Sequence, residues 1–179
     1  MTDNSSDFTI RPATFEDIGD ILIINQLTWD ISYQGCLPDE LLQERHRTFA
    51  TRLQKWQQHW QEKVGFVAEI NGKIVGETTG CLQGTIEGFD CILNTLYVNP
   101  QYQGLSIGKT LFFKFADEMK NHDKHKMEIH TMYKGVPDKN GYAKPGPSIG
   151  FYQKMGCILT ETYDTHPLGM TDVLMIKEL

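Results

Sequence analysis

The segment "VNPQYQGLSIGKTL", Val98 to Leu111, determines how the fold of this 179-residue chain is interpreted. It joins the end of an apolar run to a segment with apolar residues at helical spacing: Ile107, Leu111, Phe112, Phe115 and Met119. A glycine-bearing turn before a helix directs unpaired backbone N–H groups at one spot, which favours an anion. The plainer alternative is a connection in which Gly104 and Gly108 only relieve backbone strain.

Gly108-Lys109-Thr110 also resembles the end of a nucleotide-binding P-loop, which reads Gly, four residues, then Gly-Lys-Ser/Thr. The first glycine of that motif would be residue 103, which is Gln103, whereas Gly104 comes one position too late. The preceding strand also lies in an apparent antiparallel meander. Nucleotide binding is therefore kept only as an alternative.

Upstream of this segment, "FTIRPAT", Phe8 to Thr14, alternates like a strand and leads into a helix capped at Thr14. A second helix is expected after Pro38. Val64 to Ile70 and Lys73 to Leu82 meet across Asn71-Gly72, a strong hairpin signal, and Phe89 to Val98 follows as a third strand. The three strands predict an antiparallel meander.

Downstream, Lys126 to Tyr133 is predicted as a strand, and the glycine- and proline-rich stretch from Lys134 to Pro147 as a long loop. "SIGFYQKM" predicts a short helix that ends at Gly156, and two closing strands follow it. Neither a repeat nor a linker divides the chain, so a single domain over residues 1–179 is expected.

The bulk composition excludes several classes of protein. A formal charge of −6 without a long Lys/Arg block argues against nucleic acid and fits a cationic small substrate. The four cysteines lack CxxC pairing, and the first residues lack the pattern of a signal peptide. The longest apolar run, Ile21 to Ile24, is far below the roughly 20 residues that cross a bilayer. We expect a cytoplasmic protein that does not bind membranes.

The order of these elements, with "VNPQYQGLSIG" before a helix and "FYQKMG" at Phe151 to Gly156, closely resembles the GNAT superfamily of N-acetyltransferases. The resemblance runs from "IRPAT" at Ile10 to the C-terminal "TDVLMIKEL". It implies an α/β (α+β) fold with a mixed, mainly antiparallel central sheet of about seven strands, flanked by about four helices. A weaker likeness points to bacterial polyamine acetyltransferases, from which the stretch Lys134 to Pro147 departs.

The resemblance further implies acetyl-CoA as cosubstrate and no metal. In this family a loop motif binds the pyrophosphate of acetyl-CoA, and by resemblance it maps onto Gln103, Ser106 and Gly108. Ser106 departs from the usual glycine, so its Cβ stands where phosphate comes close and its hydroxyl can cap the helix. The expected pyrophosphate cradle comprises Gln103, Gly104, Leu105, Ser106, Ile107, Gly108 and Lys109. The expected pantetheine strand comprises Leu96, Tyr97 and Val98, beside a bulge that opens a slot in the sheet.

Acyl transfer to an amine needs a neutral amine, a stabilised oxyanion and a proton for the departing thiolate. Tyr152 occupies the tyrosine of the "F-Y-x-K-x-G" signature and is the candidate proton donor, the alternative being a tyrosine that only packs. Relatives often place a glutamate near the positions of Ile92 and Asn94, which cannot accept a proton. Glu77 and Asp90 are substitute bases acting through water, or ordinary strand carboxylates.

His130 can be a base or a core residue. By the same resemblance, Trp29 and Tyr33 wall the acceptor site. The expected function is acetyl-CoA-dependent N-acetyl transfer to a primary amine of a small molecule, with a polyamine as one candidate, by direct transfer in a ternary complex. The alternatives are a non-catalytic acyl-CoA-binding module and the nucleotide-binding protein. A homodimer is a candidate assembly.

Overall fold

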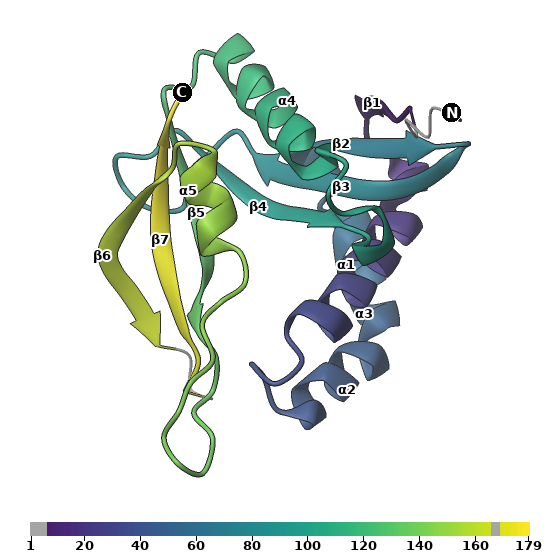
Figure 1. Cartoon of the computed structure of the whole chain (residues 1–179). Coiled ribbons are helices and arrows are strands. Elements are labelled where there is room, and N and C mark those ends of the chain that lie inside the picture. The colour runs from purple at the N-terminus through teal and green to yellow at the C-terminus, as the bar shows by residue number, and fades with distance from the viewer. Residues whose placement is uncertain (1–6, 166–168) are drawn as a thin grey trace, which may run out of the picture.

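A computed structural model describes residues 7–165 and 169–179, in which a seven-stranded sheet is flanked by five α-helices (Figure 1). The strands lie in the order β1-β2-β3-β4-β5-β7-β6, and neighbouring strands are antiparallel except β4 and β5. The strands are β1 (Thr9–Pro12), β2 (Lys63–Ile70), β3 (Lys73–Cys81), β4 (Cys91–Val98), β5 (Lys126–Lys134), β6 (Ile158–Thr165) and β7 (Thr171–Glu178).

The α-helices are α1 (Ile18–Ser32), α2 (Asp39–Arg47), α3 (Phe49–Gln58), α4 (Ile107–Asn121) and α5 (Ile149–Lys154). Short 3₁₀ turns are η1 (Phe15–Asp17), η2 (Trp60–Glu62) and η3 (Pro100–Tyr102). This architecture confirms the mixed, mainly antiparallel fold expected from the sequence. Five helices occur in the described chain instead of about four, because the segment after Pro38 is divided at Thr48, which lies between α2 and α3.

The β2–β3 hairpin shows how local sequence sets the register of the sheet. Asn71 and Gly72 both have positive φ, 52° and 72°, as a type I′ turn requires. The turn pairs Ile70 with Lys73 and brings Glu77 opposite Val67 further along the strands. The hairpin predicted from Asn71-Gly72 is confirmed.

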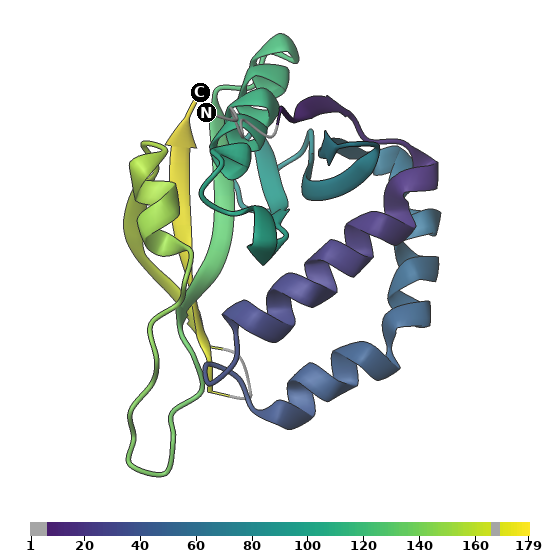
Figure 2. The ribbon, with the colours of Figure 1, turned by 45° about the vertical axis from the view of Figure 1, so that its right-hand side comes forward.

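Helices cover the two faces of the sheet in different places (Figures 1 and 2). On one face, Phe112 and Phe115 of α4 are fully buried in a cluster that also holds Tyr152 of α5. On the other face, α1 packs Ile21 and Leu22 against β2 and β3. Such apolar burial is the main stabilising term of the fold.

The sheet divides where β4 leaves β5. The two strands pair only from Cys91 to Leu93, and the β3–β4 register shifts so that Asn94 is an extra residue on β4. A bulge of this kind bends a strand away from its neighbour. Beyond it the two strands diverge, which Figure 1 shows as a V in the sheet. The bulge and the slot implied by the family resemblance are both present.

Residues 134–147 form the projecting loop seen in Figure 2. Its base is held against the segment between α1 and α2, because Val136 N–H donates to Cys36 O at 2.8 Å. A Cβ at Gly135 would lie 2.2 Å from the same carbonyl oxygen, so this close approach requires glycine. The base of the loop is therefore joined to the segment that follows α1. Among the described helices, none is long and apolar enough to cross a bilayer.

Candidate active site

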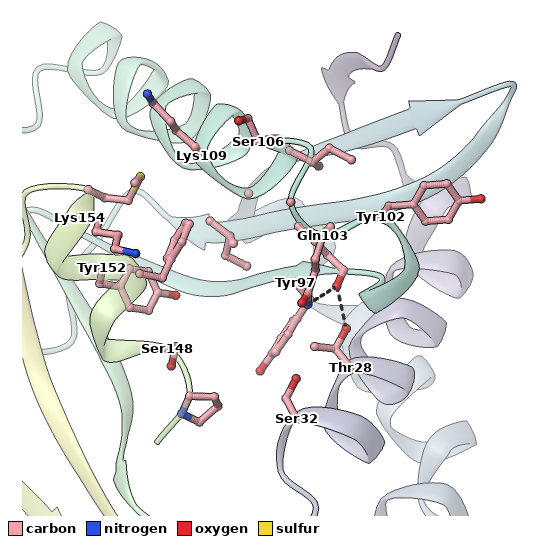
Figure 3. A pocket seen from close by; sticks show the side chains of 18 of the residues that line it. Thr28, Ser32, Tyr97, Tyr102, Gln103, Ser106, Lys109, Ser148, Tyr152 and Lys154 are labelled. Carbon is pink, nitrogen blue, oxygen red and sulfur yellow. Dashed lines mark hydrogen bonds between the residues drawn. The ribbon is translucent and has the colours of Figure 1, made fainter. Parts of the chain in front are cut away.

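A cavity of about 650 Å³ fills the slot between the end of β4, the start of α4 and α5 (Figure 3). Nine of the ten residues predicted to bind the cofactor line it; Leu105, which is 40% exposed, does not. The nine are Leu96, Tyr97, Val98, Gln103, Gly104, Ser106, Ile107, Gly108 and Lys109. The structure therefore brings the loop motif and the end of β4 to one site.

Backbone N–H groups make one wall of this cavity. From Gly104 to Lys109, these groups make no hydrogen bond within the described part of the chain. The first N–H groups of any α-helix lack intrahelical partners and carry the positive end of its dipole. Lys109 at the start of α4 and Lys154 on α5 add two ammonium groups to the lining, and Figure 3 shows Lys109 beside Ser106 and Lys154 beside Tyr152. This arrangement suits an anion with several oxygens, such as a pyrophosphate.

Ser106 adopts a left-handed conformation, with φ of 64° and ψ of 7°. Glycine adopts this conformation without steric cost, which gives the family's usual glycine at this position a physical reason. The side chain of Ser106 makes no hydrogen bond that caps α4, so the expected capping role is not observed. Ser106 instead receives Thr110 N–H on its carbonyl oxygen at 3.0 Å.

Gln103 fixes the loop to the sheet. Its Nε2 donates to the carbonyl oxygen of Val98 at 3.2 Å, and the hydroxyl of Thr28 on α1 donates to the same oxygen at 3.5 Å (Figure 3). The Val98 carbonyl is thus occupied within the protein. Gln103 holds the loop in place with its side chain, while the residues from Gly104 to Lys109, except Leu105, line the cavity.

A second cavity of about 230 Å³ adjoins the first. Five residues line both cavities: Tyr33, Leu96, Tyr97, Ser148 and Tyr152. The second cavity alone is lined by Trp29, Asn94, Thr95, His130, Thr131, Met132, Met170 and Asp172. The predicted acceptor residues, Trp29 and Tyr33, thus lie beside the predicted cofactor site.

The aromatic side chains of this second cavity are held tightly. Trp29 Nε1–H donates to the Tyr97 hydroxyl at 2.8 Å, and the rings of Trp29 and Tyr33 lie 4.6 Å apart. The guanidinium carbon of Arg45 also lies over the Trp29 ring, 3.7 Å from the ring centroid. Side chains fixed in this way form a preorganised wall, which lowers the entropy cost of binding a ligand.

Tyr152 stands where the two cavities meet, and Figure 3 shows its hydroxyl directed into the space opposite Tyr97. Burial raises the pKa of this phenol above its ordinary value of 10, and the charges of Tyr97, Cys157 and Glu77 add to the effect. The phenol therefore keeps its proton at neutral pH. Its hydroxyl makes no hydrogen bond to another residue of the described chain, which leaves the proton available to a ligand.

The two predicted carboxylates lie in different places. Glu77 on β3 is fully buried and lies opposite Tyr97 in the register of β3 and β4. Thr95, which lines the second cavity, donates a hydrogen bond from Oγ1 to Glu77 Oε2 at 2.9 Å. Burial raises the pKa of Glu77 to about 8. Asp90 lies at the other end of β4, where its carboxylate accepts the N–H groups of His125 and Lys126, both at 2.9 Å.

These two backbone hydrogen bonds hold the pKa of Asp90 below its ordinary value. Seven residues of extended strand, roughly 23 Å at about 3.3 Å per residue, separate Asp90 from Tyr97. Asp90 therefore lines neither cavity and does not join the site. Asp90 was a candidate because it directly precedes β4 in the sequence, but its side chain binds the turn that leads into β5, at the end of β4 remote from Tyr97.

Sequence reasoning passed over several residues of the cavities. Lys154 is the lysine of the "F-Y-x-K-x-G" signature, so a motif signal was available. Thr28 and Ser32 on α1, Ser148 before α5, and Asp172 on β7 carried no local signal. They come from segments far apart in the sequence and meet only because of the fold.

The pattern of residues 28–157 matches the acetyltransferase (GNAT) family, and the chain belongs to that family. The resemblance inferred from the sequence is confirmed, the protein is an acyltransferase, and the nucleotide-binding alternative does not hold. The chain is 26% identical over 147 residues to the uncharacterized N-acetyltransferase YuaI of Bacillus subtilis, covering 81% of this chain and 77% of YuaI.

Solved structures share the fold. The PaiA N-acetyltransferase of Thermoplasma acidophilum, solved in complex with coenzyme A, superposes with a TM-score of 0.73 at 17% identity, covering 97% of this chain and 99% of PaiA. YncA of Salmonella typhimurium, a putative acetyltransferase solved with acetyl-CoA, gives a TM-score of 0.61 at 20% identity, covering 96% of this chain and 94% of YncA. Both comparisons confirm the GNAT architecture.

Proposed function

We propose that this protein transfers the acetyl group of acetyl-CoA directly to a primary amine of a small molecule, in a ternary complex. The observation that supports this proposal most strongly is the meeting of two cavities at Tyr152. One cavity is lined by unpaired N–H groups and lysines, which suit a pyrophosphate. The other is lined by aromatic and polar side chains, which suit a small polar ligand.

In this arrangement the pyrophosphate of acetyl-CoA binds the N–H groups from Gly104 to Lys109, and Lys109 and Lys154 neutralise its charge. The pantetheine arm follows the edge of β4 beyond Leu93, because the pairing with β5 ends there. An extended arm with amide groups can pair with such an unpaired strand edge. This course brings the thioester to Tyr152.

The chemistry follows from counting protons. The amine nitrogen forms a bond to the acetyl carbon, the carbon–sulfur bond breaks, and the sulfur leaves as a thiolate. Tyr152 donates its phenolic proton to that sulfur, since burial keeps the phenol protonated. An ammonium substrate loses two protons in total, so one is balanced by the thiol and one leaves to solvent.

Glu77 is the proposed partner in this proton transfer. It lines neither cavity, but Thr95 connects its carboxyl group to the acceptor cavity through a hydrogen bond. With its pKa raised to about 8, Glu77 exchanges a proton near neutral pH. Its second carboxyl oxygen is buried without a hydrogen-bond partner in the described chain. We propose that the second proton lost by the substrate nitrogen, as the tetrahedral intermediate collapses, passes to Glu77 through Thr95, and that Glu77 returns it the same way to Tyr152 after the thiol has formed.

The acceptor in this proposal is small and cationic. A cavity of about 230 Å³ holds roughly eight groups the size of a water molecule, at about 30 Å³ each. Asp172 supplies a carboxylate on its wall, and four aromatic rings offer faces to an ammonium group. A polyamine, which can place one end in this cavity, is a candidate. The cytoplasmic location and the homodimer stay predictions.

The test is release of CoA thiol from acetyl-CoA with a panel of polyamines, amino-acid amides and amino sugars. We expect thiol release that depends on the amine and an acetylated product detected by mass spectrometry. The Tyr152→Phe variant, which we expect to bind acetyl-CoA as the wild type does, serves as the control for chemistry. Binding of acetyl-CoA without turnover on any amine would favour the non-catalytic acyl-CoA-binding module instead.

A further inference from the structure

His130 occupies the base of the slot. Ile129 is the last residue of β5 paired with β4, where it lies opposite Leu93, and the next residue on each strand is His130 or Asn94. Both of these line the acceptor cavity. The side chain of His130 is 39% exposed, so its imidazole contacts both the cavity and solvent.

Glu128 lies behind His130 on the same strand and has no exposure. Its Oε1 accepts hydrogen bonds from the backbone N–H and the hydroxyl of Thr85. Its Oε2 is buried with no hydrogen-bond partner in the described residues, and the atom facing it is His130 Nε2 at 3.6 Å. An unpaired buried carboxylate oxygen is costly, and a proton on Nε2 offsets that cost.

This geometry favours one tautomer of the imidazole. A proton on Nε2 is held toward Glu128, which leaves Nδ1 with the free lone pair. A histidine backed by a buried carboxylate is a common arrangement for moving protons in enzymes.

We propose that His130 accepts the proton that the acceptor ammonium must lose before attack, and that Glu128 is the positioning residue behind it. The inference rests on the proposed function and deepens it. One N–H bond of the ammonium breaks, and its electron pair stays on nitrogen as the nucleophile. The proton binds Nδ1 of His130, directly or through one water, and then passes to bulk solvent.

Glu77 and His130 differ in their exposure to solvent, and this difference gives them different roles in proton transfer. Glu77 has no exposure and no route to solvent along its own side chain, so a proton that it takes stays inside the site. His130 reaches solvent and can discharge a proton in every catalytic cycle. The one proton that the overall reaction releases therefore leaves through His130.

Other titratable groups also face this cavity and belong in any account of its pH dependence. Glu128 on β5 faces the histidine directly, whereas the remaining groups come from the elements packed around the cavity. These are Tyr33 directly after α1, Tyr97 on β4, Tyr152 on α5 and Asp172 on β7. Burial raises the pKa of each of the three phenols, so none of them changes charge at neutral pH.

The test compares the pH dependence of kcat in the wild-type enzyme and in His130→Gln, with acetyl-CoA and the amine saturating. We expect His130→Gln to lower kcat by about 10²-fold and to remove one ionisation from the acidic limb, since a positioned base contributes about 10²- to 10⁴-fold. Added imidazole should restore part of the rate to His130→Ala. Acetyl-CoA affinity, measured by calorimetry, should be unchanged in both variants.

His122→Gln is the matched control, because it removes another histidine–glutamate pair, with Glu118 at 3.5 Å at the end of α4, outside both cavities. Its kcat should equal that of the wild type. The double variant with Glu128→Gln should be no slower than His130→Gln alone, because Glu128 acts through the histidine. A His130→Gln enzyme with wild-type kcat and an unchanged acidic limb would overturn this role, while absence of wild-type turnover would instead reject acetyl transfer itself.

Discussion

The cofactor cavity and the acceptor cavity share five residues but are built differently. The cofactor cavity owes its anion-binding character to one segment, Gly104 to Lys109, whose backbone N–H groups make no hydrogen bond within the described residues and of which all but Leu105 line the cavity. The acceptor wall consists of side chains from α1, β4, β5, α5 and β7. A backbone site depends on local conformation and tolerates changes of side chain, whereas a side-chain site changes with each substitution. The same fold can therefore keep one cosubstrate and vary the acceptor.

The largest expected effect concerns the buried acid beneath the acceptor side. The pKa of Glu77 rises from 4.5 in the unfolded chain to about 8 in the fold, so the native state holds a proton that the unfolded state has lost. The free energy of unfolding must then fall as pH rises from about 4.5 to 8, and stay level above. The full shift in the pKa of Glu77 corresponds to a change of at most about 5 kcal/mol in the free energy of unfolding.

Glu77→Gln removes this dependence, because glutamine resembles the protonated acid and stays neutral. Urea unfolding of the two proteins at pH 5 and pH 8.5 measures the effect. We expect similar stability at pH 5 and a more stable variant at pH 8.5. Equal stability at both values would mean that the carboxyl group is solvated and ionises normally.

The second effect concerns the point where the cavities meet. Tyr152→Phe removes the proposed proton donor and keeps the ring that packs against Phe112. We expect kcat to fall by about 10²- to 10³-fold with little change in acetyl-CoA affinity. Tyr142→Phe, at the 65% exposed tip of the loop over residues 134–147, is the matched control and should behave as wild type. A fall in affinity at constant kcat would assign Tyr152 to binding.

The third effect separates the two cavities. Lys109→Ala removes one cation from the cofactor wall, and we expect acetyl-CoA to bind about 10- to 100-fold more weakly, since a charged hydrogen bond contributes about 1.5–3 kcal/mol. The KM of the amine should not change. Lys120→Ala, a lysine at the far end of α4 paired with Asp117, is the control for charge. Loss of amine affinity in Lys109→Ala would show that the two walls are not independent.

The smallest effect tests the backbone itself. Ser106→Gly relieves a left-handed conformation, and we expect about 0.5–1 kcal/mol of added stability, a several-fold change in CoA affinity and no change in kcat at saturation. Gly104→Ala, in the same loop at φ of 83° with open space around the new methyl group, should destabilise by about 1 kcal/mol. Thermal unfolding and calorimetry measure both. Unchanged CoA binding in Ser106→Gly would place this residue outside the cradle.

Much of the fold followed from the sequence, because its signals were local. Asn71-Gly72 specified the hairpin, and the apolar spacing from Ile107 to Met119 specified α4. The glycine loop identified the cofactor side because one segment carries the whole cradle. The division of the second helical region at Thr48 was missed, since its apolar positions continue with nearly the same spacing on both sides.

The acceptor side was harder to predict because its residues meet only in three dimensions. His130 and Asp172 belong to separate strands that pair in the sheet, and nothing in either segment marks them as neighbours of Trp29. Asp90 illustrates the opposite error, since it is adjacent in sequence to the motif strand but lies at its remote end. Which residues become neighbours in the folded sheet depends on the register and the direction of its strands.

The most direct test of the central claim is a crystal structure with CoA and a bound amine. We expect the pyrophosphate oxygens on the N–H groups from Gly104 to Lys109, the CoA sulfur within hydrogen-bond distance of the Tyr152 hydroxyl, and the amine in the cavity beside Trp29. CoA bound elsewhere, or with its sulfur remote from Tyr152, would contradict it.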